Sequence, residues 1–362
     1  MKRLIIANTY YQILFAIQLR QTIFLDDEVT LLISDHSVGT QNIAERIRDM
    51  NLFFETHYIN TLGSHDNRNI IEKIQDFCDI SFRKSNRYSF FVDQLKDKYF
   101  DEIDTYNYSI QTYGLYSILC QYNKNILVSR YEEGALSYNT LPIYTKRRDV
   151  INHVRRLIGK PDINSALSSF YCFYPEVYHG SLNCVRVPLF ESNEELKSIT
   201  QQLFELDTRK LEYKQKYIYF SSVYDFEGGD SIKEFETVLR IRELVGNDNL
   251  LVKVHPRDVR SIYTIQGFNV DTCSNIPWEV IQLNGNYSDK VLITANSTCV
   301  ISSSLITKGG IKGYYVFKCC DLSGNISAQK TTESILNILN TSEIKKLATK
   351  IKIAERLEDI LK

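Results

Sequence analysis

The sequence predicts an α/β protein with two Rossmann-like domains, each a parallel sheet covered by helices. Three observations favour this class. Short apolar runs typical of buried strands alternate with segments of helical periodicity. The alternation begins again after a polar helical segment at 191–208, and 362 residues are too many for one ordinary domain. We therefore expect an N-terminal domain at 1–190 and a C-terminal domain at 191–362.

The first half alternates strands with helices in the way that builds a parallel sheet. Each predicted strand is a short apolar run bounded by polar residues, and each predicted helix has apolar residues three or four positions apart. In chain order these are strands at 3–7 and 29–34, helices at 40–50 and 66–78, strands at 102–107 and 125–130, and helices at 146–158 and 191–208.

The second half repeats this alternation. In chain order it has a strand at 216–222, a helix at 231–246, and strands at 249–254, 290–295 and 312–317. Two amphipathic helices are predicted to close the chain, the last over 342–362. Two alternatives stay open for that last helix: it packs in its own domain, or it packs on the first domain.

Composition is that of a globular protein, with 43% hydrophobic and 24% charged residues. A formal net charge of −1 gives no electrostatic reason to expect nucleic acid as a partner. The eight cysteines show no C-x-x-C spacing, so neither disulfides nor a zinc site is expected and a reducing cytoplasm fits. The first apolar run stops at Asn8, and no run approaches the ~20 residues of a membrane span. Any membrane contact is therefore expected to be peripheral.

Chemistry is expected in the loops after strands, because ligands of open α/β sheets bind at the carboxyl ends of the strands. Five such loops are polar. In chain order they carry Asn8 and Gln12; Glu132, Glu133 and Gly134; Ser221, Ser222, Asp225 and Asp230; Lys253, His255 and Pro256; and Ser297 and Thr298.

Several of these residues allow two interpretations. His255 can hydrogen-bond or protonate a phosphate oxygen, or it can bond a backbone carbonyl. Ser297 and Thr298 precede an apolar helical run, where hydroxyl groups suit an anion and also serve as ordinary N-caps. Glu279, in the first turn of another predicted helix, can hold ribose hydroxyls or pair with the helix dipole.

The adjacent acids Glu132 and Glu133 are followed by Gly134, which frees the backbone to turn. This tripeptide is either a solvated turn or a site in which one acid is held near a reacting group. The chain contains no D-x-D motif, so a metal-bridged nucleoside diphosphate sugar is less favoured as a ligand.

Taken in order, three motifs resemble those of the bacterial sialyltransferases, which share a D/E-D/E-G motif, an HP motif and a downstream Ser/Thr-rich motif. Here they are E-E-G at 132–134, K-x-H-P at 253–256 and the hydroxyl pair at 297–298. The stretches "ANTYYQ" at 7–12 and "IPWE" at 276–279 are also similar. The sequence is most similar to glycosyltransferase family 52, over residues 5 to about 304.

The resemblance implies a GT-B-like fold, in which two Rossmann-like domains face each other across a cleft. It also implies an inverting transfer of sialic acid from CMP-sialic acid to a terminal galactose. Glu132 would be the general base, and its neighbour Glu133 would raise the pKa of one acid of the pair. His255, helped by Ser297 and Thr298, would hold or protonate the departing CMP phosphate, so that no metal or other cofactor is required.

Further roles follow from the resemblance. The residues that it assigns to donor binding are Asn8, Gln12, Gly134, Ser221, Ser222, Lys253, Pro256, Glu279, Ser297 and Thr298. Two alternatives stay open. Asp230 or Asp225 replaces Glu132 as the base in one, and Ser302–Ser304 replace the hydroxyl pair in the other.

The expected acceptor is a galactose-terminated capsule or lipooligosaccharide glycan, free or lipid-linked, with an α-2,3 linkage slightly preferred over α-2,6. The basic segment 146–160 is either a solvated helix face or a docking site on the anionic inner face of the membrane. Homodimer formation stays open. Rival hypotheses are a CDP-glycerol-type phosphotransferase, a glycosyltransferase with another donor, and a non-catalytic nucleotide-sugar-binding assembly protein.

Overall fold

A computed structural model describes most of the chain. The described residues are 1–37, 39–59, 95, 98–106, 110–138, 153–154, 156–157, 159, 162–226, 230–273, 276–306 and 310–362. The predicted helix at 66–78 and most of the one at 146–158 lie outside them, and so does most of the segment proposed for membrane docking.

Contacts divide the chain into two compact units. The first unit comprises Met1–Glu133 and Thr140–Pro188, and the second comprises Gly134–Asn139 and Leu189–Lys362. A single boundary at residue 190 was predicted from the sequence, but a short segment of the first half, Gly134–Asn139, belongs to the second unit.

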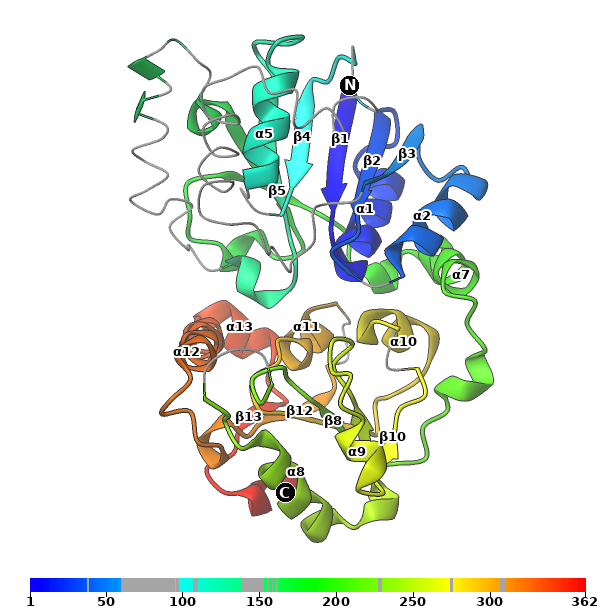
Figure 1. Ribbon diagram of the computed structural model, residues 1–362, viewed down its shortest axis with the longest axis vertical. Helices are drawn as coiled ribbons and strands as arrows, with labels where there is room; N and C mark the ends of the chain where they lie inside the picture. Colours follow the sequence, from blue (N-terminus) through cyan, green and yellow to red (C-terminus); the bar gives the residue numbers. More distant parts are fainter. Residues whose placement is uncertain are drawn as a thin grey trace. The chain divides into compact units, whose positions relative to one another are not determined.

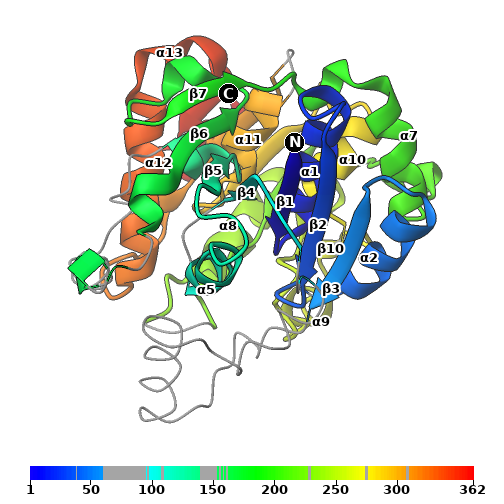
Figure 2. The ribbon, with the colours of Figure 1, turned by 90° about the horizontal axis from the view of Figure 1, so that it is seen from above.

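The first unit contains a seven-stranded parallel sheet in the order β3-β2-β1-β4-β5-β6-β7 (Figure 1). Figure 2 shows β1, β2 and β3 side by side. The bounds are β1 Lys2–Ala7, β2 Glu28–Ser34, β3 Glu55–Ile59, β4 Glu102–Thr105, β5 Leu127–Tyr131, β6 Leu167–Cys172 and β7 Asn183–Arg186. The strand order reverses between β1 and β4, which is where ligands of such sheets bind. The four predicted strands are confirmed as β1, β2, β4 and β5.

Helices cover both faces of this sheet. They are α1 Tyr10–Thr22, α2 Thr40–Asp49 and α5 Ile110–Leu119. Leu119 of α5 packs in one cluster with Leu4 and Val128. Phe15 of α1 stacks on Tyr131, with ring centroids 5.7 Å apart. Because alternate residues of a strand point to opposite faces, Val128 and Tyr131 place α5 and α1 on opposite sides of β5.

The second unit contains a six-stranded parallel sheet in the order β10-β9-β8-β11-β12-β13. The strands are β8 Tyr217–Phe220, β9 Leu250–Lys253, β10 Asn269–Val270, β11 Val291–Thr294, β12 Lys312–Tyr315 and β13 Ile351–Ile353. The helices are α7 Glu194–Leu203, α8 Glu234–Val245, α9 Ile262–Ile265, α10 Trp278–Asn284, α11 Cys299–Ile306, α12 Ile326–Asn340 and α13 Ser342–Leu347. The order reverses between β8 and β11, so the loops after these strands meet at a second candidate ligand edge.

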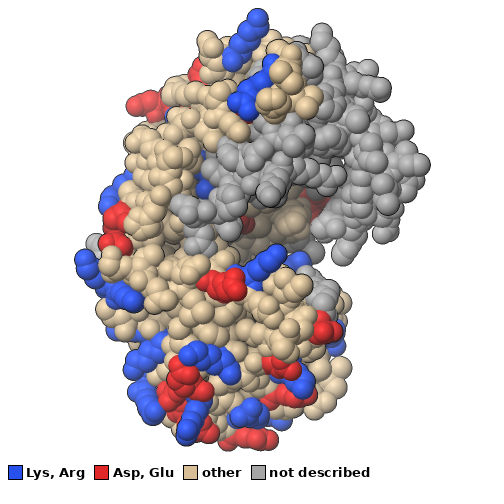
Figure 3. Space-filling model, turned by 90° about the vertical axis from the view of Figure 1, so that its left-hand side faces the viewer, with Lys and Arg blue, Asp and Glu red and all other residues tan. Residues whose placement is uncertain are grey.

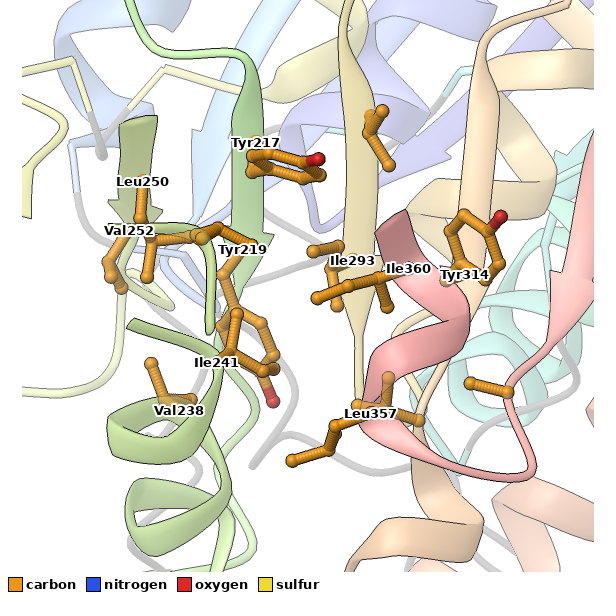
Figure 4. Packing of buried hydrophobic residues seen from close by; sticks show 14 of the residues in the cluster. Tyr217, Tyr219, Val238, Ile241, Leu250, Val252, Ile293, Tyr314, Leu357 and Ile360 are labelled. Carbon is orange, nitrogen blue, oxygen red and sulfur yellow. The ribbon is translucent and has the colours of Figure 1, made fainter. Parts of the chain in front are cut away.

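Figure 4 shows the core on one face of this sheet. Val238 and Ile241 of α8 pack there against Tyr219 of β8. On the opposite face Phe220 meets Trp278 of α10 edge-on, with ring centroids 5.1 Å apart. The predicted strands at 216–222, 249–254, 290–295 and 312–317 are confirmed as β8, β9, β11 and β12, whose apolar runs lie between these two helical layers, whereas β10 and β13 were not predicted.

The predicted closing helix at 342–362 is wrong. The chain forms α13, then the edge strand β13, then a short 3-10 helix, η8 Leu357–Leu361. Ile351 and Ile353 alternate with Lys352, and this period of two suits a strand beside β12 better than a helix. Leu357 and Ile360 belong to the core of the second unit (Figure 4).

Charged side chains of both signs are interspersed on the surface in the lower part of Figure 3, in keeping with the near-zero net charge. No helix in the described part of the chain has both the length and the apolar character needed to span a membrane.

Candidate active site

Glu132 follows β5 directly and is only 1% exposed. The hydroxyl of Tyr11 donates to its Oε1 over 3.3 Å, and the backbone N–H of Phe173 donates to its Oε2 over 3.0 Å. Both carboxylate oxygens are thus held by neighbouring elements, one by α1 and the other by the residue that follows β6.

Glu133 is partly exposed and has a different environment. Burial is the largest cause that raises its pKa, to about 7. A hydrogen bond from Gln12 and the charge of Arg130 oppose the rise. A raised pKa was predicted for one acid of the pair and is found for Glu133, but its main cause is burial and not the charge of the neighbouring acid. A carboxyl group with this pKa exchanges its proton near neutral pH, as a general base must.

The loop after β1 supports Glu133. Thr9 caps α1 by accepting the N–H of Gln12 over 3.3 Å. The buried Gln12 accepts the N–H of Asn8 at its Oε1 over 2.6 Å and donates from Nε2 to Oε1 of Glu133. Ser34 donates to Oδ1 of Asn8 over 2.6 Å. These polar groups form one connected network, and the donor-binding roles of Asn8 and Gln12 stay predictions.

Gly134 has φ of +84°, a backbone conformation that favours glycine. A Cβ at this position would lie 3.0 Å from Oγ of Ser302. The 3-10 helix that follows, η1 Ala135–Tyr138, contacts α11 and α12 in the second unit. The glycine is therefore required both by the turn after the acid pair and by close packing.

His255 lies in the loop after β9, and its backbone N–H donates to Oγ of Ser221 over 2.8 Å. Burial first, and then the charge of Arg257, lowers its pKa to about 4. The imidazole is therefore neutral at pH 7. Its Nδ1 accepts the N–H of Arg257 over 3.2 Å, which leaves the ring hydrogen on Nε2. A neutral imidazole with its hydrogen on Nε2 can donate a hydrogen bond to an anion. The adjacent residue, Pro256, is exposed.

Lys253 is 6% exposed, and its charge is paired within the protein. Its Nζ donates to Oδ2 of Asp271 and to the carbonyl of Cys273, each over 2.9 Å. Burial lowers the pKa of Lys253, while the charge of Asp271 opposes that change. Glu279, in the first turn of α10, has a pKa raised by burial, and the charge of Lys253 counteracts the rise. Lys253 therefore ties the end of β9 to the segment that follows β10.

Ser297 and Thr298 lie between β11 and α11, and both are partly exposed. The N–H of Ser297 donates to Oγ1 of Thr294 over 3.0 Å. The carbonyl of Thr298 accepts the N–H of Ser302 over 2.9 Å, so Thr298 occupies the N-cap position of α11.

The alternative hydroxyls Ser302–Ser304 are buried within α11. Oγ of Ser303 accepts the indole N–H of Trp278 over 2.7 Å and donates to the carbonyl of Cys299 over 2.6 Å. The more accessible hydroxyl groups are therefore those of Ser297 and Thr298.

Glu234, the first residue of α8, was not predicted as a site residue. It is 2% exposed, and its Oε1 accepts the hydroxyl of Tyr219 over 2.8 Å. The N–H of Ser222 lies 2.9 and 3.1 Å from its two oxygens, and Oγ of Ser222 donates to Oε2 over 2.6 Å. Burial raises its pKa to about 7. Its sequence position looked like that of any first-turn acid, so no local signal marked it.

The two alternative bases lie in the same loop. Asp225 accepts the N–H groups of Ile232 and Phe235 over 3.0 and 3.1 Å, so its carboxylate caps α8. Asp230 is exposed, and Asn325 donates to its carbonyl over 2.9 Å. Within the described residues, no cluster of three or more His, Cys, Asp or Glu side chains is placed to hold a metal ion.

The fold is similar to that of known glycosyltransferases. An alpha/beta-galactoside alpha-2,3-sialyltransferase from a luminous marine bacterium, Photobacterium phosphoreum, is 11% identical, has a TM-score of 0.53 and aligns over 99% of both chains. CalG4, the calicheamicin glycosyltransferase, is 8% identical with a TM-score of 0.49, over 99% of this chain and 94% of CalG4. MurG from Acinetobacter baumannii is 15% identical with a TM-score of 0.45, over 100% of this chain and 90% of MurG.

No protein-family model matches the chain, and none of the curated proteins does. At such low identities the structural similarity concerns the fold alone. The predicted GT-B-like fold with two Rossmann-like domains is confirmed by the two parallel sheets and by the first of these similarities.

Proposed function

We propose that this protein is an inverting glycosyltransferase that moves sialic acid from CMP-sialic acid to the terminal galactose of a bacterial surface glycan. The observation that carries the proposal is Glu133, an acid with a pKa of about 7 at the carboxyl edge of a GT-B-like sheet. The ordered E-E-G, K-x-H-P and hydroxyl motifs, each at or shortly after the carboxyl end of a strand, support the choice of donor.

The first unit supplies the base in this proposal. Glu133 in its carboxylate form removes the proton of the acceptor hydroxyl as that oxygen attacks the anomeric carbon. Glu132, whose oxygens are both held by hydrogen bonds, keeps the loop in place. The geometry therefore favours Glu133 over Glu132 and over Asp230 as the base.

The second unit holds the donor. When the bond between the anomeric carbon and the phosphate oxygen breaks, its electron pair stays on the phosphate of CMP. The Nε2–H of the neutral His255 and the hydroxyl groups of Ser297 and Thr298 donate to that phosphate. Glu279 binds the ribose hydroxyls. In this proposal the hydrogen-bond donors of His255, Ser297 and Thr298 stabilise the phosphate without a metal ion.

The test is CMP release from CMP-sialic acid with lactose as acceptor, with EDTA present. We expect Glu133→Gln to lower kcat by about 10²–10⁴-fold. His255→Gln should lower kcat and weaken donor binding, whereas the exposed His179→Gln, its matched control, should behave as wild type.

Other outcomes would redirect the proposal. Loss of turnover with Asp230→Asn, while Glu132→Gln and Glu133→Gln stay active, would move the base to the second unit. Turnover abolished by EDTA and restored by a divalent cation would refute metal independence. Binding of CMP without turnover on any galactoside would favour another acceptor or a binding protein, and binding of CDP-glycerol alone would favour a phosphotransferase.

A further inference from the structure

Glu234 does more than cap a helix, since Asp225 already performs that task for α8. The carboxylate of Glu234 points back to the end of β8, where it accepts the backbone and side-chain donors of Ser222 and the hydroxyl of Tyr219. Tyr219 itself lies in the hydrophobic core beside Ile241 (Figure 4). The conformation of Ser222, in the loop that follows β8, is therefore set by one buried acid.

The neighbouring residue, Ser221, carries this constraint to β9. Its Oγ accepts the backbone N–H of His255 over 2.8 Å, and its own N–H donates to the carbonyl of Lys253 over 3.1 Å. We propose that Glu234 is a positioning residue for His255: it fixes Ser222, and the adjoining Ser221 fixes the backbone at His255. This inference rests on the proposed function, in which His255 contacts the donor phosphate.

The carboxylate of Glu234 also couples the binding of a ligand to the uptake of a proton. Among the described residues, the titratable groups that face Glu234 are Tyr219 from β8, Asp225 from the loop, Tyr263 from α9 and Cys320 after β12. None of these groups carries a positive charge. An anion bound at the adjoining loops adds negative charge nearby and so favours the protonated form of Glu234.

Proton uptake has a simple structural consequence. A protonated Glu234 donates from one carboxyl oxygen, and Oγ of Ser222 then accepts that hydrogen instead of donating its own. The hydroxyl hydrogen of Ser222 is released from Glu234 and becomes available to another acceptor. The proton comes from solvent and forms the new O–H bond of Glu234, and apart from that bond only these hydrogen bonds change.

The test is calorimetric titration of the whole protein with CMP near pH 7, in two buffers of different ionisation enthalpy. The difference in observed heat gives the number of protons taken up on binding. We expect wild type to take up a fraction of one proton and Glu234→Gln to take up less. Glu236→Gln, an exposed first-turn acid of the same helix, is the matched control and should behave as wild type.

The imidazole of His255 can also take up a proton when phosphate binds, so His255→Gln is measured in parallel. Uptake that persists in this variant and disappears in Glu234→Gln supports the inference. A second readout is the amide chemical shift of His255 in the free protein, expected to move in Glu234→Gln and to stay in Glu236→Gln.

The failures can be told apart. Tight CMP binding with the same proton uptake and the same His255 amide shift in Glu234→Gln would overturn the positioning role and leave the proposed function intact. Absence of CMP binding by folded wild type would overturn the proposed function and the proton linkage together. Even then, an unmoved His255 amide in Glu234→Gln would refute the positioning role, because that shift is measured without ligand.

Discussion

The side-chain amide of Gln12 donates a hydrogen bond to Oε1 of Glu133, a residue 121 positions further along the chain. This bond joins the first turn of α1 to the loop after β5, across the point where the strand order of the first sheet reverses. It favours the charged form of Glu133, whereas burial favours the neutral form. The balance of these two effects keeps the pKa of this acid near 7.

Gln12→Met should shift the pH dependence of kcat. Methionine has a similar volume but cannot donate to the carboxylate, so the pKa of Glu133 should rise above about 7. The base must be ionised, and activity should therefore appear at higher pH than in wild type. The measurement is the pH profile of CMP release. Gln18→Met, which removes another buried glutamine of α1 that bonds the carbonyl of Pro188, should leave the profile in place.

Glu133→Gln should make the protein more stable at alkaline pH while it lowers kcat. The pKa of Glu133 is raised above its unfolded value, so the stability that this group contributes is present below about pH 4.5 and is lost as the pH rises through about 7. An amide removes that loss, and the free energy of unfolding at pH 8 should rise by roughly 1–3 kcal/mol. Urea denaturation at pH 5 and pH 8 measures the change; equal differences at both pH values would contradict it.

Lys253→Met should destabilise the protein by about 3–5 kcal/mol, because Asp271 would be left buried without its cation. The double variant Lys253→Met/Asp271→Leu should recover most of this loss. The control is Lys290→Met, since Lys290 is also buried but its partner Asp289 is exposed, and that change should cost less than about 1 kcal/mol. Chemical denaturation measures the loss of stability. A Lys253→Met variant as stable as wild type would contradict this structural role and favour ligand binding as the role of Lys253.

Gly134→Ala should cost more stability than the same change at Gly267. Both glycines have positive φ, so alanine at either position carries a backbone penalty of about 1–2 kcal/mol. A Cβ at Gly267 meets open space, whereas one at Gly134 approaches Oγ of Ser302. The excess at Gly134 should shrink when Ser302 is changed to Ala as well. Thermal unfolding of Gly134→Ala, Gly267→Ala, Ser302→Ala and the Gly134→Ala/Ser302→Ala double variant tests this, and equal losses at the two glycines would show that the contact relaxes freely.

The sequence was sufficient for the strands whose residues are buried on both faces, because a continuous apolar run is itself the signal. β7, at an edge of the first sheet, has no fully buried residue, and its sequence pattern is typical of a loop. β13 was hidden in a basic segment that suits a helix equally well. Patterns along the chain therefore located the centres of both sheets and missed several of their margins.

The site residues, like the strands, were predictable only where the signal is local in the sequence. His255, Ser297 and Thr298 could be found because each lies within a few residues of the end of a buried strand. The partner of Lys253, by contrast, lies 18 residues away after another strand, and no local pattern connects the two. Glu234 and Gln12 likewise take their meaning from side chains that only the folded sheet brings near. Which of two adjacent acids is more exposed also depends on tertiary packing.

The segment Gly134–Asn139 has a consequence for how the protein is made. Its helix η1 contacts α12, a helix that leaves the ribosome long after the first sheet has been synthesised. The second unit therefore cannot be completed from its own contiguous stretch of chain. A fragment that begins at Leu189 lacks the η1 residues, and in a nascent chain these residues cannot pack against α12 until that helix has been synthesised. Packing of the segment that follows the acid pair therefore depends on a helix far along the chain.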